Sequence, residues 1–435
     1  MQKAIQQYVL SKWKELFPST SAPKALATLQ ISQAHGKENK FGRVVHLLFN
    51  EGSATPILVA KFCKAMEYER SLEIEATLLK RLENSEIRDG IPRLLGVSTI
   101  NEKLVTFEEA APGTPLSVLA KNAYHRLGID VFKRTVADHM DKAADFLISL
   151  REATWTEGND GSRAEIERVI SKYADGKNLT GTEGYCIHGL ARTVESMIAD
   201  SSASLTHMDF IPANIFLPED SPQIKVIDWE FASESCLCFL DTMRFVYYYY
   251  NILQELGVAG EDGFYETFIS RSNWFSSLAF EFAAKVDGKI IKGSDDFRTM
   301  LAFFLVFEAG LQCEVSTVWS AIYMESFRGL IYNLTGFSSL KELEDKNKTI
   351  AEKDRNIADR DSAIVEKDDA IADRDRCIAE RDRAVVDRDN TITAKDNLIT
   401  GLEMKRIELE SVLNSKRWRL TYPLRWVSAR LKGIN

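Results

Sequence analysis

Short apolar runs rich in β-branched side chains mark the first part of the chain. Val44 to Phe49 and Ile57 to Phe62 each have the length and composition of a β-strand, and the turn-forming sequence NEGSATP between them suits a hairpin. Leucines recur at helical spacing from Glu67 to Leu82, and Leu104 to Phe107 is a further strand-like run that leads into a Pro-Gly break. The predicted order is strand, strand, helix and strand, followed by a break.

From that break to residue 336, helical patterns dominate. The helices that we expect run from Val131 to Ala153, from Ala191 to Asp200 and from Thr299 to Asn333. One strand-rich segment, Ser204 to Phe231, interrupts them. The chain has 435 residues, which is enough for about two or three domains.

Neither the start of the chain nor its apolar runs indicate membrane insertion. The amphipathic start, MQKAIQQYVLSKWKELF, lacks the apolar core of a signal peptide. The most apolar run, Met300 to Leu311, contains Glu308 and is shorter than the roughly 20 residues that a membrane span needs. The six cysteines form no C-x-x-C pair, which favours reduced thiols, and the net charge of −9 gives no general case for nucleic-acid binding. We therefore expect a cytoplasmic protein.

The strand-rich segment carries the candidate chemistry. Asp209 lies in a loop after a short apolar run, Asn214 follows five residues later, and Asp228 ends the apolar run Ile224 to Ile227. Phosphoryl transfer needs one carboxylate to orient the attacking hydroxyl, and a carboxylate with an amide oxygen to hold Mg²⁺. Each of these residues alone is more often a turn former. The joint pattern H-x-D-x4-N, followed by an acid at the end of a strand, is far more specific.

This pattern resembles the aminoglycoside phosphotransferase and choline kinase superfamily, whose loop is H-G-D-x-H-x-x-N and whose metal-binding strand ends in I-D-W/F-E. The matching residues are His207, Asp209, Pro212, Asn214, Ile227, Asp228, Trp229 and Glu230. The resemblance implies that Asp209 is the catalytic base, that Asn214 and Asp228 bind magnesium, and that His207 organises the loop. Met208 and Ile211 replace the usual Gly and second His, which reduces the polar groups on the acceptor side.

A kinase also needs a cation at the nucleotide phosphates, and Lys61 is the candidate. It lies in LVAKF and resembles the V-A-x-K element of kinase folds. Its expected partner is Glu75, within EATLLKRL, which resembles the family's E-x-x-L-L-x-x-L; Glu73 is the competitor. The alternative for Lys61 is an edge-strand lysine that deters aggregation.

Two further segments have weaker signals for nucleotide binding. Gly36 and Gly42 bracket a polar loop ahead of a strand, where backbone N–H groups could approach phosphate, although a plain hairpin turn gives the same pattern. The sequence FEEAAPGTPL resembles the linker between kinase lobes. By that resemblance, backbone groups between Glu109 and Ala111 contact the adenine.

A heptad repeat follows the helical region. One apolar residue recurs at every seventh position: Ile350, Ile357, Ile364, Ile371, Ile378, Val385, Ile392 and Ile399. A strict period of seven predicts a left-handed coiled coil. The alternative is a solitary charged helix, but the acid-to-base pairs four residues apart that would support it are scarce. We therefore expect a homo-oligomeric rod.

The last segment is basic and aromatic. Between Lys416 and Lys432 there are six Lys or Arg and no acid, together with Trp418 and Trp426. This composition suits an anionic membrane surface or an acidic partner, and the alternative is a solvated terminus. The string S-x-x-W-R-L-T-x-P-L-R resembles the tails of bacterial glycosyltransferases and of proteins in surface-polysaccharide assembly. A kinase followed by a long coiled coil also resembles, in architecture only, the O-antigen chain-terminating methyltransferase-kinase.

The expected fold is a two-lobed α+β kinase-like fold with a helical extension. Its predicted parts are an N-lobe at residues 1–111, a helical C-lobe at 112–336, a coiled coil at 337–413 and a tail at 414–435. The resemblance implies an ATP- and Mg²⁺-dependent phosphotransferase acting on a sugar or glycan hydroxyl in lipopolysaccharide or capsule synthesis. The alternatives are a kinase for an amino alcohol or aminoglycoside, and a nucleotide-binding scaffold for membrane enzymes.

Overall fold

The computed structural model describes residues 1–32, 43–156, 162–176, 181–199, 201–235, 237–258, 264, 267–268, 273–312, 317–334 and 387–411. The chain divides into two compact units, Met1–Glu344 and Asp345–Asn435. Gly36, Gly42, the Ile350–Val385 part of the heptad repeat and the basic tail lie outside the described residues.

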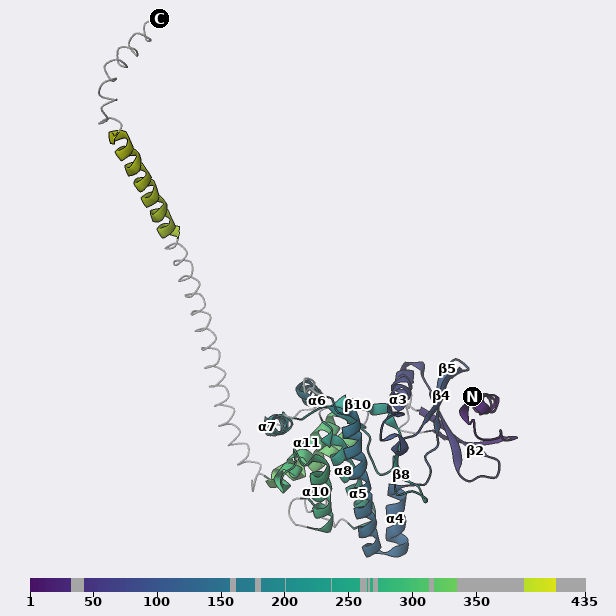
Figure 1. The fold of residues 1–435 in the computed structure, drawn as a ribbon. Coiled ribbons are helices and arrows are strands. Elements are labelled where there is room, and N and C mark those ends of the chain that lie inside the picture. Colours follow the sequence, from purple (N-terminus) through teal and green to yellow (C-terminus); the bar gives the residue numbers. More distant parts are fainter. Residues whose placement is uncertain are drawn as a thin grey trace, which may run out of the picture. The chain divides into compact units, whose positions relative to one another are not determined.

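A five-stranded antiparallel sheet forms the N-terminal part of the first unit (Figure 1). Its strand order is β1-β2-β3-β5-β4. The strands are β1 (Leu26–Ser32), β2 (Arg43–Asn50), β3 (Pro56–Cys63), β4 (Leu94–Ile100) and β5 (Lys103–Glu109). The three strands expected from the sequence are confirmed as β2, β3 and β5. The two that were not expected, β1 and β4, are the edge strands, where exposure weakens the apolar pattern.

The N-terminal residues cover one face of this sheet. Helices α1 (Gln2–Ser11) and α2 (Trp13–Leu16) bury apolar side chains against Val44, Leu48 and Phe107. Tyr8 stacks on Phe107 with ring centroids 5.0 Å apart. Because side chains alternate along a strand, the neighbours of Val44 on β2 point to the opposite face.

Helix α3 (Glu69–Leu82) follows the 3₁₀ turn η1 (Met66–Tyr68) and confirms the helix expected at Glu67 to Leu82. Its buried side includes Leu72, Leu79 and one charged residue, Glu75. A second 3₁₀ turn, η2 (Arg88–Gly90), leads into β4. A carboxylate on the buried side of an amphipathic helix needs cationic partners nearby.

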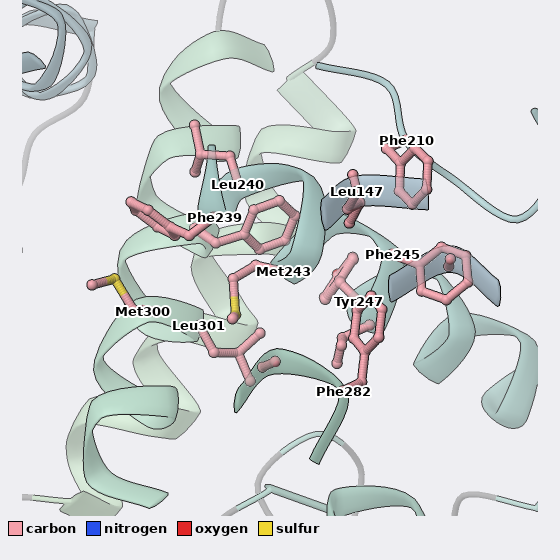
Figure 2. Close-up of a cluster of buried hydrophobic side chains, with 14 of the residues drawn as sticks. Leu147, Phe210, Phe239, Leu240, Met243, Phe245, Tyr247, Phe282, Met300 and Leu301 are labelled. Atoms are coloured by element: carbon pink, nitrogen blue, oxygen red, sulfur yellow. The ribbon is translucent and has the colours of Figure 1, made fainter. Parts of the chain in front are cut away.

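The rest of the first unit is mainly helical. Its helices are α4 (Leu116–Leu127), α5 (Ile129–Thr154), α6 (Ser162–Gly176), α7 (Gly181–Met197), α8 (Phe239–Glu255), α10 (Trp274–Asp287), α11 (Ser294–Gln312) and α12 (Thr317–Leu334). Figure 2 shows side chains of α5, α8, α10 and α11, with Phe210, meeting in one apolar core. The first unit thus has the expected two-lobed α+β arrangement, with one apolar core in the sheet-containing lobe and another in the helical lobe.

The single helix expected at Thr299 to Asn333 is wrong. Two helices, α11 and α12, occupy that stretch and pack against each other. One continuous helix of this composition would leave much of its apolar surface in water, whereas two packed helices bury it.

Short strands interrupt the helices, as the sequence predicted. Strands β6 (Thr114–Pro115), β8 (Ile215–Leu217) and β9 (Lys225–Val226) form one sheet, and β7 (Ser204–Thr206) pairs with β10 (Ser233–Ser235). The 3₁₀ turn η3 (Trp229–Phe231) follows β9. Gly113 has a φ of +93°, and a Cβ there would lie 2.1 Å from the carbonyl oxygen of Leu217. The linker after β5 therefore requires glycine at this point.

The described part of the second unit is a helix at residues 387–411, drawn in yellow-green in Figure 1. Its heptad side chains are exposed, with Ile392 at 48% and Ile399 at 53% of full exposure. None of the helices within the described ranges combines the length and hydropathy needed to cross a bilayer.

Candidate active site

Two loops converge on Asp209, Asn214 and Asp228. The Asn214 side-chain amide donates to the Asp209 carboxylate at 2.6 Å and to the Asp209 carbonyl at 3.1 Å. The backbone N–H of Ile227 donates to the carbonyl oxygen of Asn214 at 2.9 Å, which ties the residue before Asp228 to the first loop. The structure thus brings together the three residues that the spacing singled out.

His207 joins the same two loops from inside. It has no solvent exposure, and its Nε2 lies 3.0 Å from the carbonyl oxygen of Ile227, while Nδ1 accepts the N–H of Asp209 at 3.2 Å. Both contacts are satisfied by a neutral ring protonated at Nε2. Burial lowers the pKa of His207 to about 3, so the ring stays neutral at physiological pH. This geometry suits a loop organiser better than an acid or base.

Asp241 on α8 holds the backbone of the first loop. Its carboxylate accepts the N–H groups of His207 at 2.6 Å and of Met208 at 2.9 Å. Met208 has a φ of +65°, a left-handed conformation that glycine adopts more readily. Asp241 was not singled out in the sequence. Its signal was an acid inside the mostly apolar run CLCFLDTMRFV.

Arg244 and Glu308 form a buried ion pair next to this aspartate. Arg244 lies on α8 and Glu308 on α11, and both are almost fully buried. Arg244 also contacts Asp241 at 3.4 Å. The charge of Glu308 inside an apolar run therefore has a structural explanation in its arginine partner.

Asp209 has the electrostatic environment of a base that works near neutral pH. Burial raises its pKa to about 7, because the charged form loses hydration. The charge of Arg244 and the hydrogen bond from Asn214 lower this pKa, while the nearby charge of Asp228 raises it. A base is most effective when its pKa lies near the working pH.

Lys61 and Glu75 form an ion pair inside the sheet–helix junction. Lys61 Nζ lies 2.7 Å from Glu75 Oε1, whereas Glu73 is exposed on the other side of α3. Glu75 Oε1 also accepts the backbone N–H of Trp229 at 3.0 Å, which links the pair to the Asp228 loop. Burial by itself would raise the pKa of Glu75, but the charges of Lys61 and Arg43 hold it below its ordinary value.

Arg43 is a site residue that the sequence reading missed. It begins β2, and the register pairs it with Cys63 and pairs Val45 with Lys61, so Arg43 and Lys61 share one face of the sheet. The Arg43 side chain is 4% exposed and contacts Glu75 at 2.7 Å. The available signal was a charged residue directly before the apolar run Val44 to Phe49.

Glu108 is a second buried acid that contacts Lys61. Its Oε2 lies 2.9 Å from Lys61 Nζ, and its Oε1 is buried with no hydrogen-bond partner among the described residues. Burial, and then the charge of Glu75, raise the pKa of Glu108 to about 7. The sequence-based prediction placed nucleotide contacts from Glu109 onward and did not include the Glu108 side chain.

The linker after β5 is only partly free to contact a base. The backbone N–H of Glu109 donates to the carbonyl oxygen of Arg93, and the Glu109 carboxylate pairs with Lys225 at 3.3 Å. The N–H of Ala110 donates to Ile57. Strand β5 ends at Glu109, so Ala111 lies two residues beyond its end.

Asn214 and Asp228 offer oxygen ligands of the type that Mg²⁺ prefers. Because the Asn214 nitrogen donates to Asp209, its side-chain oxygen is the group left to face a metal. Mg²⁺ is usually bound through one or two such side chains together with substrate phosphates. In the described ranges, no set of three or more His, Cys, Asp or Glu residues is arranged to hold a metal by itself. The donor set fits a metal shared with a nucleotide.

Comparison with known proteins adds the following. No family model matches the chain, and no significant match exists among curated proteins. Among solved structures, an aminoglycoside phosphotransferase from Streptomyces rimosus is 16% identical, with a TM-score of 0.42 over 69% of this chain and 97% of that protein. An ethanolamine kinase from Plasmodium vivax is 13% identical, with a TM-score of 0.43 over 75% and 88%. A glucosamine kinase is 13% identical, with a TM-score of 0.40 over 73% and 97%.

Proposed function

We propose that this protein is an ATP- and Mg²⁺-dependent phosphotransferase that phosphorylates a hydroxyl group. The observation that supports it is the connection between Lys61, Glu75 and the Asp228 loop, made by the Lys61 ion pair and the Trp229 N–H. A lysine on the third strand paired with a glutamate on the next helix is the arrangement that active kinases require.

Each residue has a distinct role in this proposal. Lys61, held by Glu75, positions the nucleotide phosphates, and Asp209 orients the acceptor hydroxyl and takes its proton. Asn214 and Asp228 would hold Mg²⁺, whose charge offsets that of the phosphates. His207 keeps both loops in register through its two ring nitrogens.

The nucleotide contacts that we propose beyond these residues are based on the sequence pattern alone. Backbone groups near Gly36 would approach the phosphates, and Ala111 with Glu109 would contact the adenine. Of these, Ala111 has the better position, because the Glu109 N–H already donates to Arg93.

The acceptor that we propose is a sugar or glycan of bacterial surface polysaccharide. Its support is the resemblance of the tail at 414–435 to proteins of that assembly. In the same proposal, residues 337–413 form a homo-oligomeric coiled coil, and the tail contacts a membrane surface or a glycosyltransferase. The exposed heptad side chains of the helix at 387–411 are consistent with the coiled coil.

The test is nucleotide turnover by the full chain and by Asp209→Asn, with a panel of free and lipid-linked glycans, amino alcohols and aminoglycosides. We expect one acceptor to stimulate ATP consumption, and the variant to lose at least about 100-fold in rate, because the general base is gone. MgATP should still raise the melting temperature of both proteins.

Asp220→Asn is the matched control, since Asp220 is exposed. It should turn over ATP at the wild-type rate. Binding of MgATP without turnover on any acceptor would instead support the nucleotide-binding scaffold. Equal rates for wild type and Asp209→Asn would contradict the role of Asp209.

A further inference from the structure

Arg43 lies among carboxylates from different elements. Its Nη1 is 2.7 Å from Glu75 Oε2 on α3 and 3.1 Å from Asp228 Oδ1 after β9. Its Nε is 2.7 Å from Oε2 of Glu230 in η3. With 4% exposure, this guanidinium has little access to water, so its charge is balanced by protein carboxylates.

One of these carboxylates is a proposed metal ligand. A divalent cation at Asp228 and the guanidinium of Arg43 carry like charges and would contact the same carboxylate group. The two cations therefore oppose each other at Asp228. A metal that binds there would weaken the contact between Arg43 and Asp228, and the guanidinium would then favour an additional anionic partner beside Glu75 and Glu230.

Nucleotide phosphates would be that partner. A guanidinium is planar and always charged, and it binds phosphate oxygens in a bidentate manner. Arg43 also lies on the same sheet face as Lys61, and both contact Glu75. A phosphate held by Lys61 would thus lie within the same cluster of charges as Arg43.

We propose that Arg43 is an internal counter-ion for Asp228 that weakens binding of free divalent cations and moves onto the phosphates when nucleotide binds, which leaves Asp228 to the metal. This inference rests on the proposed function, because it takes Asp228 as the metal ligand. It makes metal and nucleotide binding cooperative through one side chain. A purely structural ion pair would produce no such coupling.

The experiment compares the full chain with Arg43→Gln in two binding measurements. Free Mn²⁺ without nucleotide is measured by electron paramagnetic resonance, and ADP in EDTA is measured by calorimetry. We expect Mn²⁺ to bind at least about fivefold more tightly to the variant, and metal-free ADP at least about fivefold more weakly, the lower range of coupling between sites. Arg81→Gln, which removes an exposed ion pair to Glu234, should change neither value.

The opposite signs make the result decisive. Weaker binding of both ligands would show that Arg43 is only structural, and unchanged Mn²⁺ affinity would also overturn the proposal. If Arg43→Gln does not fold, Arg43→Lys decides the matter. Lysine keeps the positive charge but cannot bind phosphate in a bidentate manner. Metal-free ADP should therefore bind more weakly to Arg43→Lys, while its Mn²⁺ affinity stays at the wild-type value. Unchanged ADP affinity would overturn the proposal.

A third variant separates this inference from the function on which it rests. Asp228→Asn should abolish Mn²⁺ binding. If it does so and Arg43→Gln has no effect, only the inference about Arg43 fails. If Asp228→Asn leaves Mn²⁺ binding unchanged, the proposed metal site and the inference both fail.

Discussion

At the scale of single residues, burial decides which charges can exist in this site. Glu75 has no solvent exposure, yet it stays ionised because Lys61, Arg43 and the Trp229 N–H all contact its carboxylate. Glu108 is almost as fully buried, but one of its oxygens has no hydrogen-bond partner in the part of the chain that the structure describes, and its pKa rises to about 7. The two carboxylates differ in the number of cationic and N–H partners, which is the quantity that offsets desolvation.

His139 shows the same effect far from the site and leads to a pH prediction. It is 1% exposed on α5, contacts the Tyr249 hydroxyl, and burial lowers its pKa from 6.5 to about 4. The unfolded chain takes up a proton below pH 6.5, whereas the folded chain does so only near pH 4. Stability is therefore lost as the pH falls through this window.

When the pH falls from 7.5 to 5, His139 alone should lower the free energy of unfolding by about 2 kcal/mol. In His139→Gln that part of the acid sensitivity should be absent, as measured by urea unfolding at both pH values. The contribution of His207 is common to both proteins and cancels. An unchanged difference between the two pH values in the variant would contradict this assignment.

At the scale of elements, helix pairs and edge strands explain where sequence patterns were insufficient. Edge strands β1 and β4 went unpredicted because an edge strand needs no continuous apolar run. The stretch from Thr299 to Asn333 has one helical pattern throughout, and only the packing of α11 against α12 reveals that it folds back. Local periodicity identifies a helix but not the point where the chain reverses.

The Arg244–Glu308 pair between α8 and α11 gives a stability prediction. Glu308→Gln leaves a buried arginine with Asp241 as its remaining carboxylate contact among the described residues, so unfolding free energy should fall by about 3–5 kcal/mol. The double variant Arg244→Met, Glu308→Leu removes both charges and should recover most of the loss. Chemical denaturation of the wild type and the two variants measures these differences, and a double variant no more stable than Glu308→Gln would contradict the explanation.

At the scale of the whole molecule, the heptad repeat gives a prediction of assembly. The helix at 387–411 exposes Ile392, Ile399, Leu402 and Leu409, which occupy the two core positions of one heptad frame. In the proposed coiled coil, another copy of the helix would bury this stripe. We expect the full chain to be oligomeric in light scattering and a chain ending at residue 336 to be monomeric.

The matched variants lie on the same helix. Ile392→Asn with Ile399→Asn should shift the full chain toward monomer, because polar groups then lie at the core positions. Thr393→Asn with Thr400→Asn, one position along, should leave the mass unchanged. A full chain that is monomeric at every concentration measured would rule out the coiled coil.

The sequence by itself identified the candidate site residues and predicted the coiled coil. Asp209 and Asn214 lie within one loop, and a period of seven is readable without any contact, so both follow from local order. Tertiary structure alone decided the rest. Arg43 and Asp228 are 185 positions apart, and only the packing of the sheet on the second loop brings their charges together. Side chains two positions apart on a helix point to nearly opposite sides. Glu75 rather than Glu73 contacts Lys61 because α3 packs on the sheet with the Glu75 side buried.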